Sequence, residues 1–445
     1  MPPGSRWRTW LFTPVDGASL AVFRIGFGAL MLFEMQAYLF SGDVYWQYIA
    51  PTFHFTYPGF HWVKPWPGWG MYAHFWVLAA LAICVMVGWQ YRLATVLFFV
   101  GWTYVFLLEA TQYLNHFYLI CLFSLLLIFL PAHRVWSVDA WRRPGSPFIP
   151  AWCYGLLRAQ IGLVYFYAGV AKINPDWLRG EPLRMWLADL SHRPVVGPLL
   201  REEWLVMLFS YGGLLLDLFI APLLLWRRTR FAALVLVSLF HLTNATVFGI
   251  GIFPWLMLMT TGLFFEGDWP RRLVRRAVPA APRQPFPYSA GVVRWAGAYL
   301  AIQILLPLRH FAYPGEVSWT EEGHRFSWHM KLRTKEATAV FWATDRDTGR
   351  TWRVNPEEYL LQRQFSRMST RPDLIRQFAR HIANEQRRFG RSNVAVRAEV
   401  KASLNGRPPQ WLIDPNVNLV TQQWDWRPAT WIVPLRDNPA ADPQP

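Results

Sequence analysis

The sequence contains a series of apolar runs that are long enough, or nearly long enough, to cross a lipid bilayer. The runs lie at residues 17–40, 72–91, 93–110, 113–131, 151–170, 203–226, 230–249, 251–266 and 290–307. A helix needs about 20 apolar residues to span the hydrocarbon core, and two of the runs are short or poorly separated from their neighbours. The chain is therefore predicted to be a polytopic α-helical membrane protein with eight or nine transmembrane helices.

Composition agrees with this interpretation. Charged residues make up 16% of the chain and hydrophobic residues 53%, whereas soluble domains carry about 25% charged residues. The formal net charge of +16 arises from basic residues that flank the apolar runs. Basic residues in such loops are typical of a membrane protein, whose partners are membrane lipids. They do not form the single basic stripe of a nucleic-acid-binding surface, so we expect no nucleic-acid partner. The cysteines all lie inside apolar runs, which predicts neither disulfides nor a metal site.

The arginines also predict an orientation. Arginine-rich segments at 6–8, 92, 134–143, 227–230 and 271–276 fall on one side of the membrane if nine spans alternate. Because cytoplasmic loops carry the excess of Lys and Arg, we expect a cytoplasmic N-terminus and an extracytoplasmic chain after residue 308. The longer connection 172–202 is expected to hold an interfacial helix.

The C-terminal part changes character. Turn residues at 345–349 predict a hairpin, residues 371–390 predict a helix closed by Gly390, and Asn405-Gly406 predicts a turn between two strands. Residues 309–437 are expected to form a small extracytoplasmic α+β, β-rich domain after a transmembrane domain at 1–308. The last residues, 438–445, are predicted to be a disordered tail.

Ionisable residues inside the apolar runs need a partner or a function, because each costs about 2.5–3.5 kcal/mol or more at the centre of a membrane. Arg158 and Asp217 each lie in the cytoplasmic half of their helices when depth is counted from the helix ends. We therefore predict that these two side chains form a buried structural ion pair.

A further group of polar residues falls in the outer half of the membrane. The group consists of Asn115, His116, Tyr165, Lys172, His241 and Asn244. Burial disfavours the charged form of a lysine, so a desolvated Lys172 would be a neutral amine able to remove a phenolic proton. The residues support such a site and a set of separate interfacial polar groups about equally. An apolar wall with few polar groups would suit a lipid-soluble quinol.

Long segments of the chain resemble vitamin K-dependent γ-glutamyl carboxylases. Examples are "YLNHFYLICLFSLLLIFLPAHRVWSVD", "LRAQIGLVYFYAGVAKINPDWLRG", "FSWHMKLR" and "WLIDPNVNLV". The similarity covers residues 17–435, and the chain resembles a short, bacterial member with an HTTM-type membrane domain. The resemblance implies an enzyme that oxidises reduced vitamin K, as phylloquinol or menaquinol, with O2 to its 2,3-epoxide. The strong base so generated removes a γ-proton from a glutamate of a peptide or protein, and CO2 then adds. No metal is implied.

Carried over by position, the resemblance makes Lys172 the base that starts the reaction and His116 a second catalytic residue. The quinol site would be formed by Asn115, Tyr165, His241 and Asn244. The peptide glutamate would be bound by Trp328, His324 and Arg333. The animal enzymes carry a second lysine directly before the base, where this chain has Ala171, and they have Tyr and His at the positions of His324 and Arg333.

These departures leave two alternatives open. The first is an enzyme that oxidises or epoxidises the quinol without carboxylating a peptide. The second belongs to another class, a transporter or binding module with a periplasmic cap, which the unbroken apolar runs and the lack of internal repeats disfavour. In each case the expected location is a bacterial inner membrane.

Overall fold

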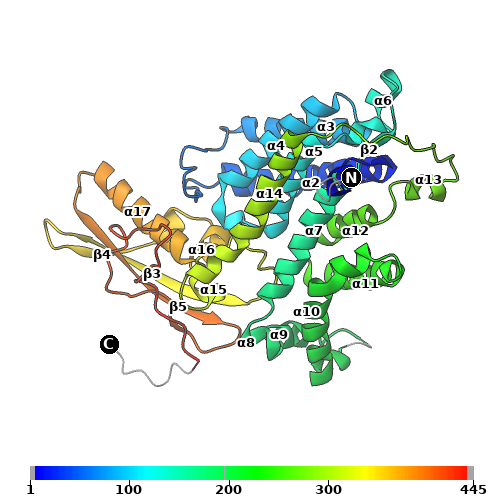
Figure 1. The fold of residues 1–445 in the computed structure, drawn as a ribbon. Coiled ribbons are helices and arrows are strands. Elements are labelled where there is room, and N and C mark those ends of the chain that lie inside the picture. Colours follow the sequence, from blue (N-terminus) through cyan, green and yellow to red (C-terminus); the bar gives the residue numbers. More distant parts are fainter. Residues whose placement is uncertain (1–5, 195–196, 438–445) are drawn as a thin grey trace.

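The computed structural model describes residues 6–194 and 197–437. Helices make up most of the chain as far as Leu308, and we call this part the helical domain; a smaller β-containing part follows, which we call the cap (Figure 1). The long helices are α2 (Ala18–Ser41), α3 (Trp69–Val87), α4 (Tyr91–Leu108), α5 (Asn115–Phe129), α7 (Trp152–Ala171), α10 (Glu203–Leu225), α11 (Arg230–Phe248), α12 (Phe253–Thr261) and α14 (Ala290–Leu308). Each coincides with one predicted apolar run within a few residues, because a helix satisfies its backbone hydrogen bonds without water.

Length and composition separate these helices into two groups. Within the described ranges, six are long and apolar enough to cross a membrane, namely α2, α3, α4, α10, α11 and α14. Helix α5 and the segment Phe253–Phe264 are apolar but shorter. Helix α7 is 20 residues long and is not among the six, since it carries Arg158 and Gln160. The predicted helical character is confirmed, whereas eight or nine crossings are not confirmed.

Short elements connect the long helices. They are α1 (Arg6–Leu11), β1 (Pro14–Asp16), α6 (Val138–Arg142), β2 (Phe148–Pro150), α8 (Pro175–Leu178), α9 (Leu183–Asp189) and α13 (Trp269–Leu273). The antiparallel pair β1 and β2 places Val15 opposite Ile149. The connection 172–202 contains two of these short helices, α8 and α9, where one interfacial helix was predicted.

Helices α7 and α10 approach each other closely at Gly169. A Cβ atom at this position would lie 2.7 Å from Cδ2 and 3.0 Å from the backbone nitrogen of Leu218. Any larger residue would push the two helices apart. The small residue therefore brings the C-terminal end of α7 against the middle of α10.

The cap is built on a four-stranded antiparallel sheet. Its strand order is β4 (Thr351–Val354), β3 (Lys335–Asp345), β5 (Val394–Leu404) and β6 (Gln410–Trp411). Helix α17 (Pro372–Arg388) packs on the sheet, where Phe378 meets Phe341 edge to face at 4.9 Å. The cap also contains α15 (Val317–Thr320) and α16 (Gln362–Met368).

The predicted elements of the cap are confirmed. The hairpin turn lies between β3 and β4, and Gly390, with a φ of 81°, follows the end of α17. Asn405 and Gly406 form the turn after β5, both with positive φ. The predicted tail, 438–445, lies outside the described residues.

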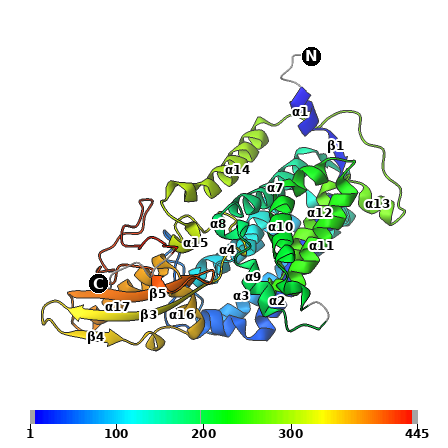
Figure 2. The ribbon, with the colours of Figure 1, turned by 90° about the horizontal axis from the view of Figure 1, so that it is seen from below.

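The cap is fixed to the helical domain at several points. Arg407, after the β5 turn, binds Asp176 of α8 through two hydrogen bonds of 2.7 and 2.6 Å. At another contact, buried Glu109 accepts a hydrogen bond of 3.0 Å from Gln364 of α16. Helix α14 lies beside α7 and leads into the cap (Figures 1 and 2). The hydrogen bonds between Arg407 and Asp176 therefore attach the segment that follows Lys172 to the cap.

Candidate functional site

Lys172 caps the C-terminal end of α7 and forms a buried ion pair. Its Nζ lies 2.5 Å from Oδ2 of Asp217 in α10, and the two side chains are 7% and 5% exposed. Nζ also donates to the carbonyl oxygen of Ala168 at 3.3 Å and lies 5.2 Å from the centre of the Trp177 ring. The lysine therefore has a charged partner, in addition to the apolar surroundings predicted for it.

This contact shows that the predicted pair of Arg158 with Asp217 was wrong. Arg158 instead donates to the carbonyl oxygens of Leu263 and Phe265, at 2.7 and 2.9 Å. The prediction counted depth from the ends of the helices and assumed that α7 and α10 end in one plane.

The N-terminal part of α10 in fact extends past the end of α7. There Trp177 of α8 donates through Nε1 to the carbonyl oxygen of Ser210 at 2.9 Å. Asp217 consequently lies level with the end of α7, next to Lys172.

A second group of predicted residues gathers around Phe253. The Tyr165 hydroxyl is hydrogen-bonded to Nε2 of His241 at 2.7 Å. The ring of Phe253 lies 6.2 Å from the ring of His241 and 5.9 Å from the ring of His116. Residues of α5, α7 and α11 thus meet beside one aromatic side chain.

Asn244 follows His241 by one turn of α11 and is half-buried. Within the described ranges its side chain forms no hydrogen bond with the other residues of this group. Its predicted role stays a prediction.

Asn115 connects the helical domain with the cap. Its Oδ1 accepts from the Tyr113 hydroxyl at 2.9 Å, and its Nδ2 donates to the backbone carbonyl of His329 at 2.9 Å. The backbone N–H of Phe326 donates to the same Tyr113 hydroxyl at 2.6 Å. These contacts hold the cap segment 326–331 against the start of α5. We call this segment the cap loop.

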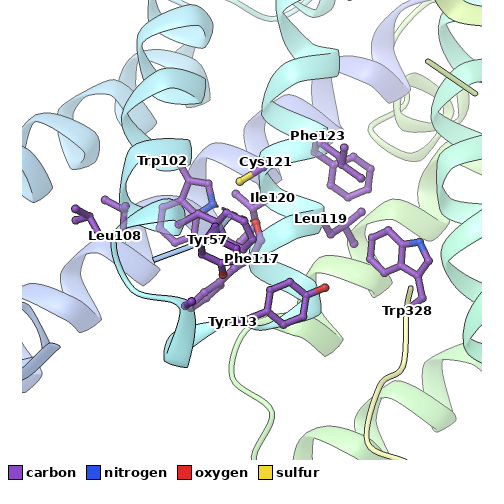
Figure 3. Packing of buried hydrophobic residues seen from close by; sticks show 14 of the residues in the cluster. Tyr57, Trp102, Leu108, Tyr113, Phe117, Leu119, Ile120, Cys121, Phe123 and Trp328 are labelled. Atoms are coloured by element: carbon purple, nitrogen blue, oxygen red, sulfur yellow. Dashed lines mark hydrogen bonds between the residues drawn. The ribbon is translucent and has the colours of Figure 1, made fainter. Parts of the chain in front are cut away.

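Trp328 of the cap loop is buried among side chains of the helical domain. Its ring lies 5.2 Å from that of Tyr118, and Figure 3 shows it close to Leu119 of α5. Trp328 and Phe326 both have positive φ, near 59° and 65°. Residues other than glycine rarely adopt this backbone conformation. Such strained residues concentrate at functional sites.

A buried charged cluster lies on the cap side of this loop. Glu321 forms an ion pair with Arg333 at 2.6 Å. Nζ of Lys335 and Nδ1 of His324 each lie 3.7 Å from the same carboxylate. Burial lowers the pKa of Lys335 to about 7, against the opposing charge of Glu321. Burial and the charge of Arg333 also hold the pKa of His324 well below its usual value. One carboxylate thus faces several basic groups.

Sequence reasoning missed several of these residues. Asp217 was assigned to another partner, and Glu321, His329 and Lys335 were not singled out. No short motif identifies them, although Glu321, His329 and Lys335 each lie in or within a few residues of the segment "FSWHMKLR". The aspartate of "NPDW", Asp176, is the signal that could have indicated how the cap is attached.

The residues around Phe253 fit a quinol. The Nδ1 atom of buried His241 has no hydrogen-bond partner within the described part of the chain, so it can bind an oxygen substituent on a ring. Phe253 and Phe240, whose ring lies 5.2 Å from that of His241, offer apolar aromatic surfaces beside it. No group of three or more potential metal-ligating side chains occurs among the described residues.

Two family models match the chain. Residues 12–269 match the HTTM domain, which defines the protein as an integral membrane protein of this class. Residues 289–438 match the vitamin K-dependent gamma-carboxylase, lumenal domain. The chain belongs to the vitamin K-dependent γ-glutamyl carboxylase family. No solved structure matches it.

Proposed function

We propose that the protein is a membrane enzyme that couples two reactions. It oxidises reduced vitamin K with O2 to the 2,3-epoxide, and it adds CO2 to the γ-carbon of a glutamate in a peptide or protein. The observation that supports this proposal best is the buried ion pair of Lys172 with Asp217, at 2.5 Å. A proton-accepting group of this kind is the one that the first reaction needs.

Lys172 acts as the initiating base, and Asp217 acts with it. Two opposite charges in contact form a neutral pair, and the pair stays neutral when the proton moves from nitrogen to oxygen. Burying it therefore does not require an isolated charge inside the protein. With the proton on Asp217, the Lys172 amine is free to accept the hydroxyl proton of the quinol.

Four further residues hold and orient the quinol. These are Asn115, Tyr165, His241 and Asn244. His241 binds through its free Nδ1, since its Nε2 is already hydrogen-bonded to Tyr165. His116 supports proton transfer beside the aromatic wall. When bound, reduced vitamin K supplies, on its oxidation, the strong base that removes the γ-proton of glutamate.

The charged cluster of the cap binds the glutamate. A carboxylate is held best by several hydrogen-bond donors around it, and Arg333, Lys335 and His324 offer these within reach of Glu321. Trp328 closes the site from the side of α5. The cluster belongs to the cap and Lys172 to the helical domain, and we propose that the peptide and the lipid-soluble quinol reach them from different directions.

We also propose how the chain lies in the membrane. Eight or nine helices cross a bacterial inner membrane, with a cytoplasmic N-terminus and an extracytoplasmic cap. The arginine-rich segments, which fall on one side of the membrane if nine spans alternate, support this orientation.

A single pair of assays tests the proposal. The purified protein receives vitamin K hydroquinone, O2, a short glutamate-containing peptide and labelled CO2, and both the epoxide and the bound label are measured. We expect both products from the wild type and neither from Lys172→Ala. Epoxide formation by a folded Lys172→Ala variant would refute the assignment of the base.

One observation favours a second candidate, oxidation of the quinol without carboxylation. Arg333 already pairs with a carboxylate of the chain itself, Glu321, at 2.6 Å, and this contact competes with a substrate glutamate. Epoxide without incorporated label would support this candidate.

A further inference from the structure

His329 of the cap loop is a buried histidine to which no role has been given so far. It is 7% exposed, and its ring lies 4.7 Å from that of His310, edge to face, and 5.3 Å from that of His324. Both of its ring nitrogens lack a hydrogen-bond partner within the described residues. Buried polar groups in folded proteins are almost always paired, so two unpaired nitrogens on one buried ring call for an explanation.

The structural contribution of His329 comes from its backbone. Its carbonyl oxygen accepts the hydrogen bond of 2.9 Å from Nδ2 of Asn115 and so fixes the cap loop to α5. The side chain makes no hydrogen bond in this contact. The loop therefore needs a residue at this position and has no need of an imidazole.

The ring lies next to the charged cluster, 5.3 Å from the ring of His324, and the backbone of the same residue is bound to Asn115 of the helical domain. Burial, followed by the charges of His310, Arg333 and Lys172, lowers the pKa of His329 to about 3. The ring is therefore neutral at pH 7 and offers one N–H donor and one acceptor nitrogen.

We propose that the side chain of His329 contacts the glutamate substrate and donates a hydrogen bond to its γ-carboxyl group. Arg333 and Lys335 hold the same group from the cap side, and His329 directs it toward Lys172 and the quinol. His329 is thus a specificity-determining residue of the glutamate site. This inference rests on the proposed function, since it requires glutamate to be the substrate.

The test uses two variants of the full-length protein. His329→Phe keeps a planar ring and the backbone carbonyl but removes both nitrogens, and His329→Gln restores a donor and an acceptor. We expect His329→Phe to raise the KM for a short glutamate-containing peptide by about 10- to 100-fold, as for the loss of a hydrogen bond to a charged group. The KM for vitamin K hydroquinone should not change, and His329→Gln should recover part of the loss.

Stability separates this role from a structural one. Replacing an unpaired buried polar group by an apolar one of similar shape is neutral or stabilising. We therefore expect the midpoint of thermal unfolding of His329→Phe to equal or exceed that of the wild type. An unchanged KM for the peptide would overturn the proposal, as would a lower unfolding midpoint together with equal losses in both KM values. A wild type that forms epoxide but incorporates no labelled CO2 would overturn the proposed carboxylation and this inference together.

Discussion

The ion pair of Lys172 with Asp217 should affect the free energy of unfolding and epoxide formation separately. The variant Asp217→Asn keeps the shape of the side chain and removes its charge. Lys172, whose side chain is 7% exposed, then lies in the protein without a counter-charge. Removing one partner of a buried pair costs about 3–5 kcal/mol, so we expect the free energy of unfolding of Asp217→Asn to fall by about this amount.

The double variant Lys172→Met/Asp217→Asn provides the control. It buries no charge, and methionine has nearly the length of lysine. Replacement of a whole buried pair by uncharged residues is often neutral, so most of the lost stability should return. Epoxide formation should not return, because the double variant and Lys172→Met both lack the base.

The measurement is unfolding in detergent micelles for the wild type, the two single variants and the double variant. The four values give the coupling energy between positions 172 and 217. A loss of less than about 1 kcal/mol in Asp217→Asn would show that no buried charge was left uncompensated. Additive effects of the two single variants would likewise refute the reasoning.

Three further predictions concern other parts of the structure. Gly169→Ala should lower the midpoint of thermal unfolding, since overpacking costs about 1–3 kcal/mol, and it should reduce epoxide formation. The control is Gly212→Ala, which has no atom within 4 Å of the new Cβ and should match the wild type. Although burial alone would raise the pKa of Asp176, its hydrogen bonds from Arg407 and Asn405 lower it below 3.8. The pair should therefore stabilise the protein fully above about pH 4 and less as the pH falls further, and Arg407→Ala should abolish this loss in unfolding experiments. Burial lowers the pKa of Lys335 to about 7, so the KM for the glutamate peptide should rise as the pH increases through this value, and Lys335→Arg should remove the dependence.

The helices of the protein could be predicted because their physical cause is local. A run of about 20 apolar residues has few alternatives to a helix, and the bounds of α2 and α10, Ala18–Ser41 and Glu203–Leu225, lie within one residue of the predicted runs. The turns at Gly390 and Asn405 could be predicted for a similar reason, because residues that tolerate positive φ are few.

The contacts between these elements could not be predicted in the same way. The partner of Asp217 depends on how far α10 slides along α7, and the close approach at Gly169 decides this. Counting residues from the helix ends gave Arg158, because such counting treats the connection 172–202 as a loop at one level. The contact of Trp177 with Ser210 shows that the connection packs against α10 instead.

The role inferred for His329 was also out of reach from the sequence. Its neighbour Asn115 is 214 residues away in the chain, and nothing local in either segment indicates the contact. A buried residue without partners can be recognised only when its surroundings are known.

The contacts of the cap loop with the start of α5 have a consequence for the synthesis of the protein. The ribosome makes the helices first, and the loop that binds Asn115 follows 214 residues later. Until then the amide of Asn115 lacks this partner, and Trp328 has not yet covered Tyr118. A nascent chain thus carries the start of α5 before the segment that covers it has been made. The last part of the polypeptide therefore completes the packing around Asn115 and Tyr118.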